Sequence, residues 1–242
     1  MCTSCMKVST IPMCHRLPER LKSVAAQVIP GRPMADVGTD HAKLPLELVR
    51  TNTVPSAIAM DIADGPLEIA RRAASTMGDR VVVRRSDGLN ALRPNEVATI
   101  CICGMGGKTM AEILRRGQSI WKTAERLVLQ PQGVPQAVRA EMTRCGWDCV
   151  FGEVVEDRGK LFTVEAWERC QTMSAWTDLD YRWGRSIRSA PNALYASWLQ
   201  AEISDIDLAL ARMDEGGASD HPKATVARHE RAVIQKELDR IL

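Results

Sequence analysis

The sequence lacks long apolar runs. The longest, such as residues 99–103 and 127–129, have the length of buried strands, and none approaches the roughly 20 residues that cross a bilayer. Residues 1–14 also lack the continuous apolar core of a secretion signal. We therefore expect a protein that contacts no membrane and works in the cytoplasm.

An excess of charge of one sign is missing as well. The 32 Lys and Arg residues against 30 Asp and Glu residues give a formal net charge of +2, which is not the general basic signature of a nucleic-acid-binding protein. Contacts with RNA phosphates would have to come from local groups of cations, although each group also suits a solvated surface. The candidates are Arg16, Arg20, Lys22, Arg115, Arg116, Arg182, Arg185 and Arg188.

The eight cysteines form no complete disulfide or zinc pattern. Those between residues 101 and 170 are scattered or lie in a strand-like run, which indicates a reducing environment. Near the amino end, a short cluster resembles half of a metal clip but lacks the second spaced pair of a structural zinc site. We expect no metal there, and the role of the cluster stays open. It consists of Cys2, Cys5, Cys14 and His15.

Apolar periodicity divides residues 17–167 into alternating helices and strands. Two strands at the end follow each other without a helix, which predicts an antiparallel hairpin at the edge of the sheet. The fold class is therefore α/β, a Rossmann-like sheet that is parallel apart from one antiparallel edge strand, as in class I methyltransferases. The expected strands are 33–37, 56–60, 81–85, 97–103, 127–129, 149–156 and 161–167, and the helices are 17–29, 43–50, 67–77, 107–114 and 135–145.

The carboxyl-terminal part has a different pattern. Apolar residues recur at steps of four and three, and a break at residues 215–222 precedes a second stripe, which predicts an antiparallel coiled-coil hairpin of two helices. We divide the chain into residues 1–170 and 171–242, and expect a monomer. Whether the hairpin covers the sheet, dimerises or positions a substrate stays open. Its stripes are Leu199, Ile203, Ile206, Leu210 and Met213, then Ala227, Ile234, Leu238 and Ile241.

Acidic residues recur where the expected strands end. Asp36 and Asp40 flank Gly38, Asp61 ends the second strand, and Asp87 follows the third. Because the carboxyl ends of parallel strands meet at one edge of a sheet, these side chains should share a ligand site. The alternative for the first turn is a connection in which Asp40 caps the next helix, and for Asp87-Gly88 it is a plain turn.

Two missing motifs narrow the chemistry. The first turn has one glycine among acids in place of G-x-G-x-x-G, so it would repel a diphosphate and suits the cationic sulfonium of S-adenosylmethionine better than NAD. The N/D-P-P-Y/F motif, which holds exocyclic amines in many methylases, is also absent. A ring nitrogen carries its own lone pair and needs positioning more than activation. A nearby carboxylate would stabilise the cationic product.

Six blocks of the sequence resemble the successive signatures of the TrmK family, the bacterial tRNA (adenine-22-N1)-methyltransferases. The match runs in order from about residue 17 to 167, and the expected helical hairpin is similar to the family's coiled-coil domain. Three departures are Met60 before Asp61, Gln132 where asparagine is common, and the absence of Gly-Pro near residues 181–187. The blocks are ADVGTDHAKLPL (35–46), AIAMDIADGP (57–66), DGL (87–89), ICGMGG (102–107), LVLQPQ (127–132) and EDRGK (156–160).

The resemblance implies an S-adenosylmethionine-dependent enzyme that methylates N1 of adenine 22 in tRNA. It does not say which acid is nearest the base, or whether His41 acts chemically. A small-molecule methyltransferase and a non-catalytic RNA-binding protein on the same fold stay open as alternatives. The implied catalytic residues are Asp36, Asp40 and His41; the cofactor site adds Gly38, Asp61, Asp87, Gly88, Gly104, Met105 and Gly106; the substrate site consists of Gly107, Gln130, Pro131, Gln132, Arg16 and Arg20.

Overall fold

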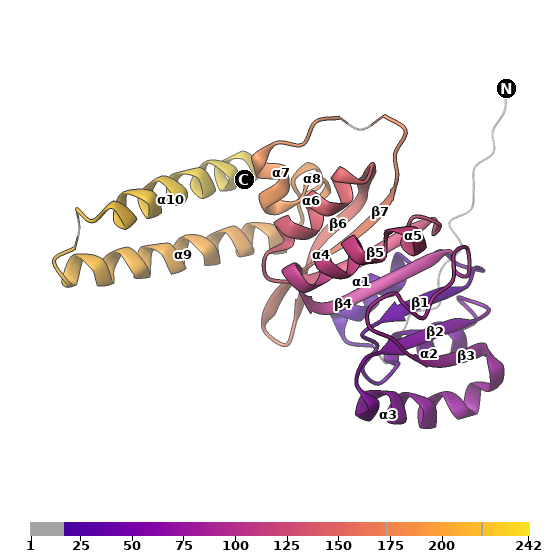
Figure 1. Ribbon diagram of the computed structural model, residues 1–242. Helices are drawn as coiled ribbons and strands as arrows, with labels where there is room; N and C mark the ends of the chain where they lie inside the picture. Colours follow the sequence, from indigo (N-terminus) through magenta and orange to yellow (C-terminus); the bar gives the residue numbers. More distant parts are fainter. Residues whose placement is uncertain (1–16, 173, 219) are drawn as a thin grey trace.

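The computed structural model describes residues 17–242 except Met173 and Ser219 (Figure 1). Arg16 and the cysteine cluster near the amino end therefore lie outside the described residues. No helix in the described part of the chain is long and apolar enough to cross a membrane. Within the same residues, no group of three or more His, Cys, Asp or Glu side chains is arranged to hold a metal ion.

A single seven-stranded sheet forms the centre of the first part of the chain. Its strand order is β3-β2-β1-β4-β5-β7-β6. The five strands from β1 to β5 pair in parallel, and β7 pairs antiparallel with both β5 and β6. The prediction of a parallel sheet with an antiparallel hairpin at its edge is confirmed, with the reversed strand next to the outermost one. The strands are β1 (Met34–Val37), β2 (Ala57–Asp61), β3 (Val81–Arg85), β4 (Thr99–Gly106), β5 (Arg126–Gln132), β6 (Trp147–Asp157) and β7 (Lys160–Arg169).

Helices cover both faces of this sheet. Side chains of β1 alternate between two apolar clusters, since Met34 packs with the helices of one face and Ala35 with those of the other. One face carries α1 (Glu19–Ala26), α2 (Lys43–Arg50) and α3 (Asp64–Ala74), the last continued by a 3-10 turn at Ser75–Arg80; the other carries α4 (Gly107–Arg116), α5 (Gln118–Trp121) and α6 (Pro135–Arg144).

Strands β4 and β5 run further than the sequence predicted. We expected β4 to close before Gly104 and β5 before Gln130, because glycine and proline usually break strands. In the structure, Met105 pairs with Pro131 and Gly106 with Gln132, beyond a register shift between Cys103 and Met105. Gly104, at φ 76°, takes the extra position in this bulge, so the ladder resumes after it.

The expected helical hairpin is present. Helices α9 (Ala193–Glu215) and α10 (Pro222–Ile241) form an antiparallel pair that projects away from the sheet (Figure 1). Leu199, Ile203, Ile234 and Leu238, all predicted for the seam, are buried in one cluster with Tyr195. Two short helices that the sequence did not predict, α7 (Asp178–Trp183) and α8 (Arg185–Ser189), lie between the sheet and this hairpin.

Ion pairs join the hairpin to the sheet through α7 and α8. Arg139 on α6 is fully buried against Glu165 of β7, and its Nη1 donates to the backbone carbonyls of Tyr181 and Arg182 at 2.9 and 2.6 Å. On the other side, Arg188 of α8 donates to Glu237 of α10. These contacts fix the base of the hairpin against the sheet.

Candidate active site

A cavity of about 530 Å³ lies at the carboxyl ends of β1 and β4. The β1–α2 turn forms one wall, α1 another, and the β6–β7 turn the third. The cavity brings together several residues that the sequence predicted for one site. Both acidic and basic side chains line it. From the predicted set, Arg20, Asp36, Gly38, Asp40, Gly104 and Gln132 line it.

Asp36 is buried at the back of this cavity, with 5% of its surface exposed. Burial raises the pKa of its carboxyl to about 6, and the nearby charge of Asp61 acts in the same direction. A 2.7 Å hydrogen bond from Thr39 Oγ1 and the charge of Arg20 oppose this rise only in part. Asp36 is therefore a carboxyl that can exchange a proton near neutral pH.

The turn after β1 contains Gly38, which lines the cavity. This residue has a φ of 74°, and a Cβ placed on it would lie 2.2 Å from Cε of Met105. The N–H groups of Gly38 and Thr39 both donate to the carbonyl of Met60, at 2.8 and 2.9 Å, so the turn is anchored to β2. A larger residue at position 38 would therefore collide with the side chain of Met105.

The alternative in which Asp40 caps α2 is wrong. Ala42 occupies the cap position with a φ of 54° and no side-chain cap, and Asp40 itself is left-handed at φ 52°. The Asp40 carboxylate is free of the helix end and exposed at the cavity rim, where Oδ1 lies 3.6 Å from Nε2 of His41. His41 lines neither this cavity nor the one beside it, and its Nδ1 is buried without a partner among the described residues.

Asp61 is coupled to this turn through the backbone. Its Oδ2 accepts a 3.3 Å hydrogen bond from the N–H of Asp40, and its Oδ1 accepts one of 3.0 Å from Ala63. The carboxylate remains partly exposed at the end of β2. It therefore joins the two strand ends that the sequence placed in one site.

Gln130 is completely buried beneath the cavity, and its side-chain oxygen accepts two hydrogen bonds. Its Oε1 accepts from Nη1 of Arg20 at 2.7 Å and from the N–H of Gly104 at 3.1 Å. The Arg20 guanidinium also lies 5.6 Å from the centre of the Phe162 ring and 3.8 Å from Asp157. Arg20 is thus an interior group of the site.

Other predicted residues lie outside the cavity. Asp87 binds Arg116 through both carboxylate oxygens, at 3.0 and 3.2 Å, and this contact lowers the pKa of Asp87. Gly107 begins α4 and is buried. A Cβ at this position would lie 2.2 Å from the carbonyl oxygen of Val134, so the backbone there is tightly packed. Pro131 lines a neighbouring cavity, whereas Gly88, Met105 and Gly106 line neither of the two cavities.

The structure adds cations that the sequence did not single out. Lys43, Arg158 and Lys160 line the cavity, and none of them forms an ion pair with another described residue. By contrast, those cations proposed from sequence clustering that the structure describes are engaged with acids of the protein, Arg20 among them with Asp157. Lys22 pairs with Glu19, Arg115 with Glu112, Arg116 with Asp87, Arg182 with Glu230, Arg185 with Asp148 and Arg188 with Asp180. The EDRGK block contained two of the missed residues.

This sheet order, with one reversed strand and a cavity lined by acidic and basic side chains at the carboxyl ends of its central parallel strands, is typical of class I methyltransferases. The family described as "Methyltransferase domain" matches residues 17–164 of the chain. The tRNA (adenine(22)-N(1))-methyltransferase of Bacillus subtilis is 35% identical over 151 residues, which are 62% of this chain and 63% of that protein. The aligned part thus spans less than two thirds of this relative.

Solved structures match over nearly their whole length. Bacillus subtilis TrmK, described as an m1A22 tRNA methyltransferase, has a TM-score of 0.79 at 27% identity, covering 93% of this chain and 98% of its own. Streptococcus pneumoniae Sp1610 in complex with S-adenosyl-L-methionine has a TM-score of 0.81 at 29% identity, covering 90% and 98%. The chain belongs to the methyltransferase domain family, and it is similar to Bacillus subtilis TrmK in sequence and in fold.

Proposed function

We propose that this protein transfers a methyl group from S-adenosylmethionine to N1 of adenine 22 in tRNA. The observation that supports the proposal most is the pairing of buried Asp36 with exposed Asp40 around Gly38, in one cavity of a chain similar to Bacillus subtilis TrmK. The cavity, at about 530 Å³, falls in the usual range of small-molecule sites.

The residues present fit this cofactor. Asp61 presents a partly exposed carboxylate at the end of β2, suited to accept two hydrogen bonds from ribose hydroxyls. Gly38 lines the cavity beside Asp36, and Asp36 offers an acid to a cation. When bound, S-adenosylmethionine supplies a methyl group on a positively charged sulfur. We assign Asp87, Gly88, Met105 and Gly106 to the surrounding wall of the same site.

We assign the reacting side of the site to Asp40 and His41, with Asp36 behind them. The Asp40 carboxylate lies at the cavity rim, where it can stabilise the positive charge that N1 methylation places on adenine. Nε2 of His41 lies 3.6 Å from that carboxylate. Asp36, with its pKa of about 6, holds or accepts a proton at the back of the cavity.

The base and the RNA would approach from the side of β5 and β7. Gly104 and Gln132 line the cavity there, Arg20 and Gln130 support it from below, and Pro131 and Gly107 shape the adjoining wall. The cations at the rim, Lys43, Arg158 and Lys160, are suited to phosphates because no protein acid neutralises them among the described residues. We further propose that residues 1–170 are the catalytic domain and residues 171–242 a helical domain, and that the protein acts as a cytoplasmic monomer.

The test combines product analysis with cofactor binding. tRNA incubated with the protein and S-adenosylmethionine should gain 1-methyladenosine, detected by mass spectrometry of its nucleosides. Calorimetry should show cofactor binding that Asp61→Ala weakens, while Asp64→Ala, an exposed acid three positions further on, leaves it unchanged. Methylation of a small molecule without RNA would favour a small-molecule methyltransferase. RNA binding without any methyl transfer would favour a non-catalytic protein.

A further inference from the structure

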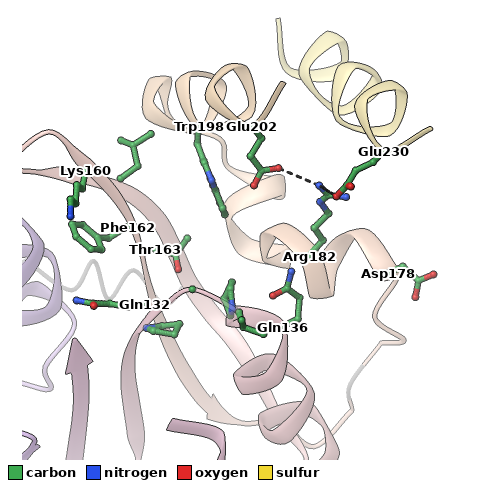
Figure 2. A pocket seen from close by; sticks show the side chains of 15 residues that line it. Gln132, Gln136, Lys160, Phe162, Thr163, Asp178, Arg182, Trp198, Glu202 and Glu230 are labelled. Atoms are coloured by element: carbon green, nitrogen blue, oxygen red, sulfur yellow. Dashed lines mark hydrogen bonds and ion pairs between the residues drawn. The ribbon is translucent and has the colours of Figure 1, made fainter. Parts of the chain in front are cut away.

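A second, larger cavity of about 840 Å³ adjoins the first (Figure 2). It lies between the ends of β5 and β7 on one side and helices α7, α9 and α10 on the other. Gln132, Lys160 and Phe162 line both cavities, so the two spaces are continuous along the strand ends. A ligand in the first cavity that extends toward the hairpin would enter the second.

Trp198 of α9 points from the hairpin into this second cavity (Figure 2). Its ring meets Tyr195 edge-on, with ring centres 6.1 Å apart, and it remains partly exposed. The indole N–H forms no hydrogen bond with another described residue, unlike those of Trp121, Trp176 and Trp183. A partly exposed indole lining a cavity is a suitable surface for stacking a flat ring.

Beside this ring, the polar side chains favour a base over a phosphate. Glu202, one helical turn after Trp198, and Glu230 of α10 both bind Nη2 of Arg182, at 3.4 and 2.9 Å. One cation against two carboxylates leaves a net negative charge, which repels a phosphate. The remaining carboxylate oxygens can accept hydrogen bonds from an exocyclic amino group.

We propose that this cavity holds a second base of the RNA, adjacent to the methylated adenine, stacked on Trp198 with an amino group directed toward Glu202 and Glu230. This rests on the function proposed above. The phosphates of the two nucleotides then lie on the side of Arg158 and Lys160, where the free cations are. The hairpin thereby positions the substrate through one defined contact.

The kinetic test uses the full-length protein with Trp198→Leu, which keeps an apolar side chain but removes the flat ring, and Trp198→Phe, which keeps a ring. We expect Trp198→Leu to raise KM for tRNA roughly tenfold with little change in kcat, and Trp198→Phe to restore most of the loss. Affinity for S-adenosylmethionine should stay unchanged in both. Leu208→Ala, at an exposed apolar position further along α9, is the matched control.

A binding test without catalysis separates this proposal from the reaction itself. 2-Aminopurine placed in turn at each nucleotide flanking the target should lose fluorescence at one position when the wild-type protein binds, and not with Trp198→Leu. Quenching at no flanking position, or a wild-type KM in Trp198→Leu, would overturn the proposal. If Trp198→Leu also lost cofactor binding, the 2-aminopurine fluorescence series with the wild-type protein would test the stacking proposal by itself. Absence of 1-methyladenosine with quenching intact would refute the proposed reaction alone.

Discussion

Arg20 on α1 and Gln130 on β5 meet beneath the candidate active site, where Nη1 donates to Oε1 at 2.7 Å across 110 positions of the chain. The same oxygen accepts the N–H of Gly104 in the β4 bulge. One buried amide therefore connects the first helix, the bulge and the fifth strand. The shape of the cavity floor depends on this junction.

Replacing Gln130 with leucine should loosen that floor. The N–H of Gly104 and the Arg20 guanidinium would each lose a partner, which costs about 1–3 kcal/mol of the free energy of unfolding. Urea unfolding and calorimetry should show lower stability together with weaker cofactor binding. Gln136→Leu, at an exposed position on α6, is the control. Equal effects from the two substitutions would contradict this role for Gln130.

Asp36→Asn should stabilise the protein above pH 6 and have little effect near pH 4. Below pH 3.8 the Asp36 carboxyl is protonated in both the folded and the unfolded chain. Between pH 3.8 and about 6 it is ionised only in the unfolded chain. Above pH 6 it is ionised in the folded chain as well, which then carries a buried charge. The amide removes this charge, so the gain at pH 8 reaches up to about 3 kcal/mol. Thermal melts at both pH values measure it, with exposed Asp64→Asn as control. An equal gain at both pH values would refute the explanation.

Gly107→Ala should be strongly destabilising. The added Cβ would lie 2.2 Å from the carbonyl oxygen of Val134 and 2.5 Å from that of Gly133, and backbone atoms cannot move aside as a side chain can. We expect a loss of about 2–3 kcal/mol in the free energy of unfolding. Gly65→Ala in α3, where nothing lies within 4 Å of the new carbon, should be neutral or stabilising. Similar unfolding curves for the two variants would show that the backbone of residues 133 and 134 does not pack tightly against residue 107.

Glu237→Gln should weaken the base of the hairpin in a pH-dependent way. Burial alone would raise the pKa of Glu237, but hydrogen bonds from Arg240, Arg188 and Tyr195 lower it to about 2. The stabilisation is therefore present above pH 4.5 and lost as the pH falls toward 2. We expect a cost of about 2 kcal/mol at pH 7 and much less near pH 2.

Chemical denaturation at both pH values provides this measurement. Asp239→Asn, an exposed acid on the same turn of α10, is the matched variant and should change little. A cost for Glu237→Gln that is the same at both pH values would mean that packing, and not charge, holds Glu237 in place.

Much of the fold could be predicted because local patterns agree with tertiary packing. Strands β1 to β3 and helix α2 fall within about two residues of their predicted bounds. Strands β1 and β2 are almost entirely buried and therefore mostly apolar, whereas β3 is a partly exposed edge strand that its three β-branched valines indicated. The strands around Gly104 and Pro131 were underestimated, because the bulge that lets pairing resume depends on a neighbouring strand. The short helices α7 and α8 were not predicted, although Thr177 and Asp180 form a local capping box for α7; both helices are also held by partners distant in sequence, α7 by Arg139 and α8 by Glu237.

The site itself was only partly accessible from sequence. Acids at successive strand ends indicated Asp36, Asp40 and Asp61, and the structure places them around one turn. Sequence clustering could not show which cations lack a partner. Arg115, Arg116 and Arg188 pair with acids distant in the sequence, whereas Lys43 has no such partner among the described residues.

For the turn at Asp36 to His41, the sequence alone determined the residue types and their position after a buried strand, because strand periodicity and the glycine are local properties. Only the tertiary structure decided their states. Asp36 is a buried acid with a raised pKa because α1, β2 and β4 enclose it, and Asp40 is exposed because Ala42 occupies the helix cap. Burial and free charge are set by contacts among distant segments, and local sequence does not encode them.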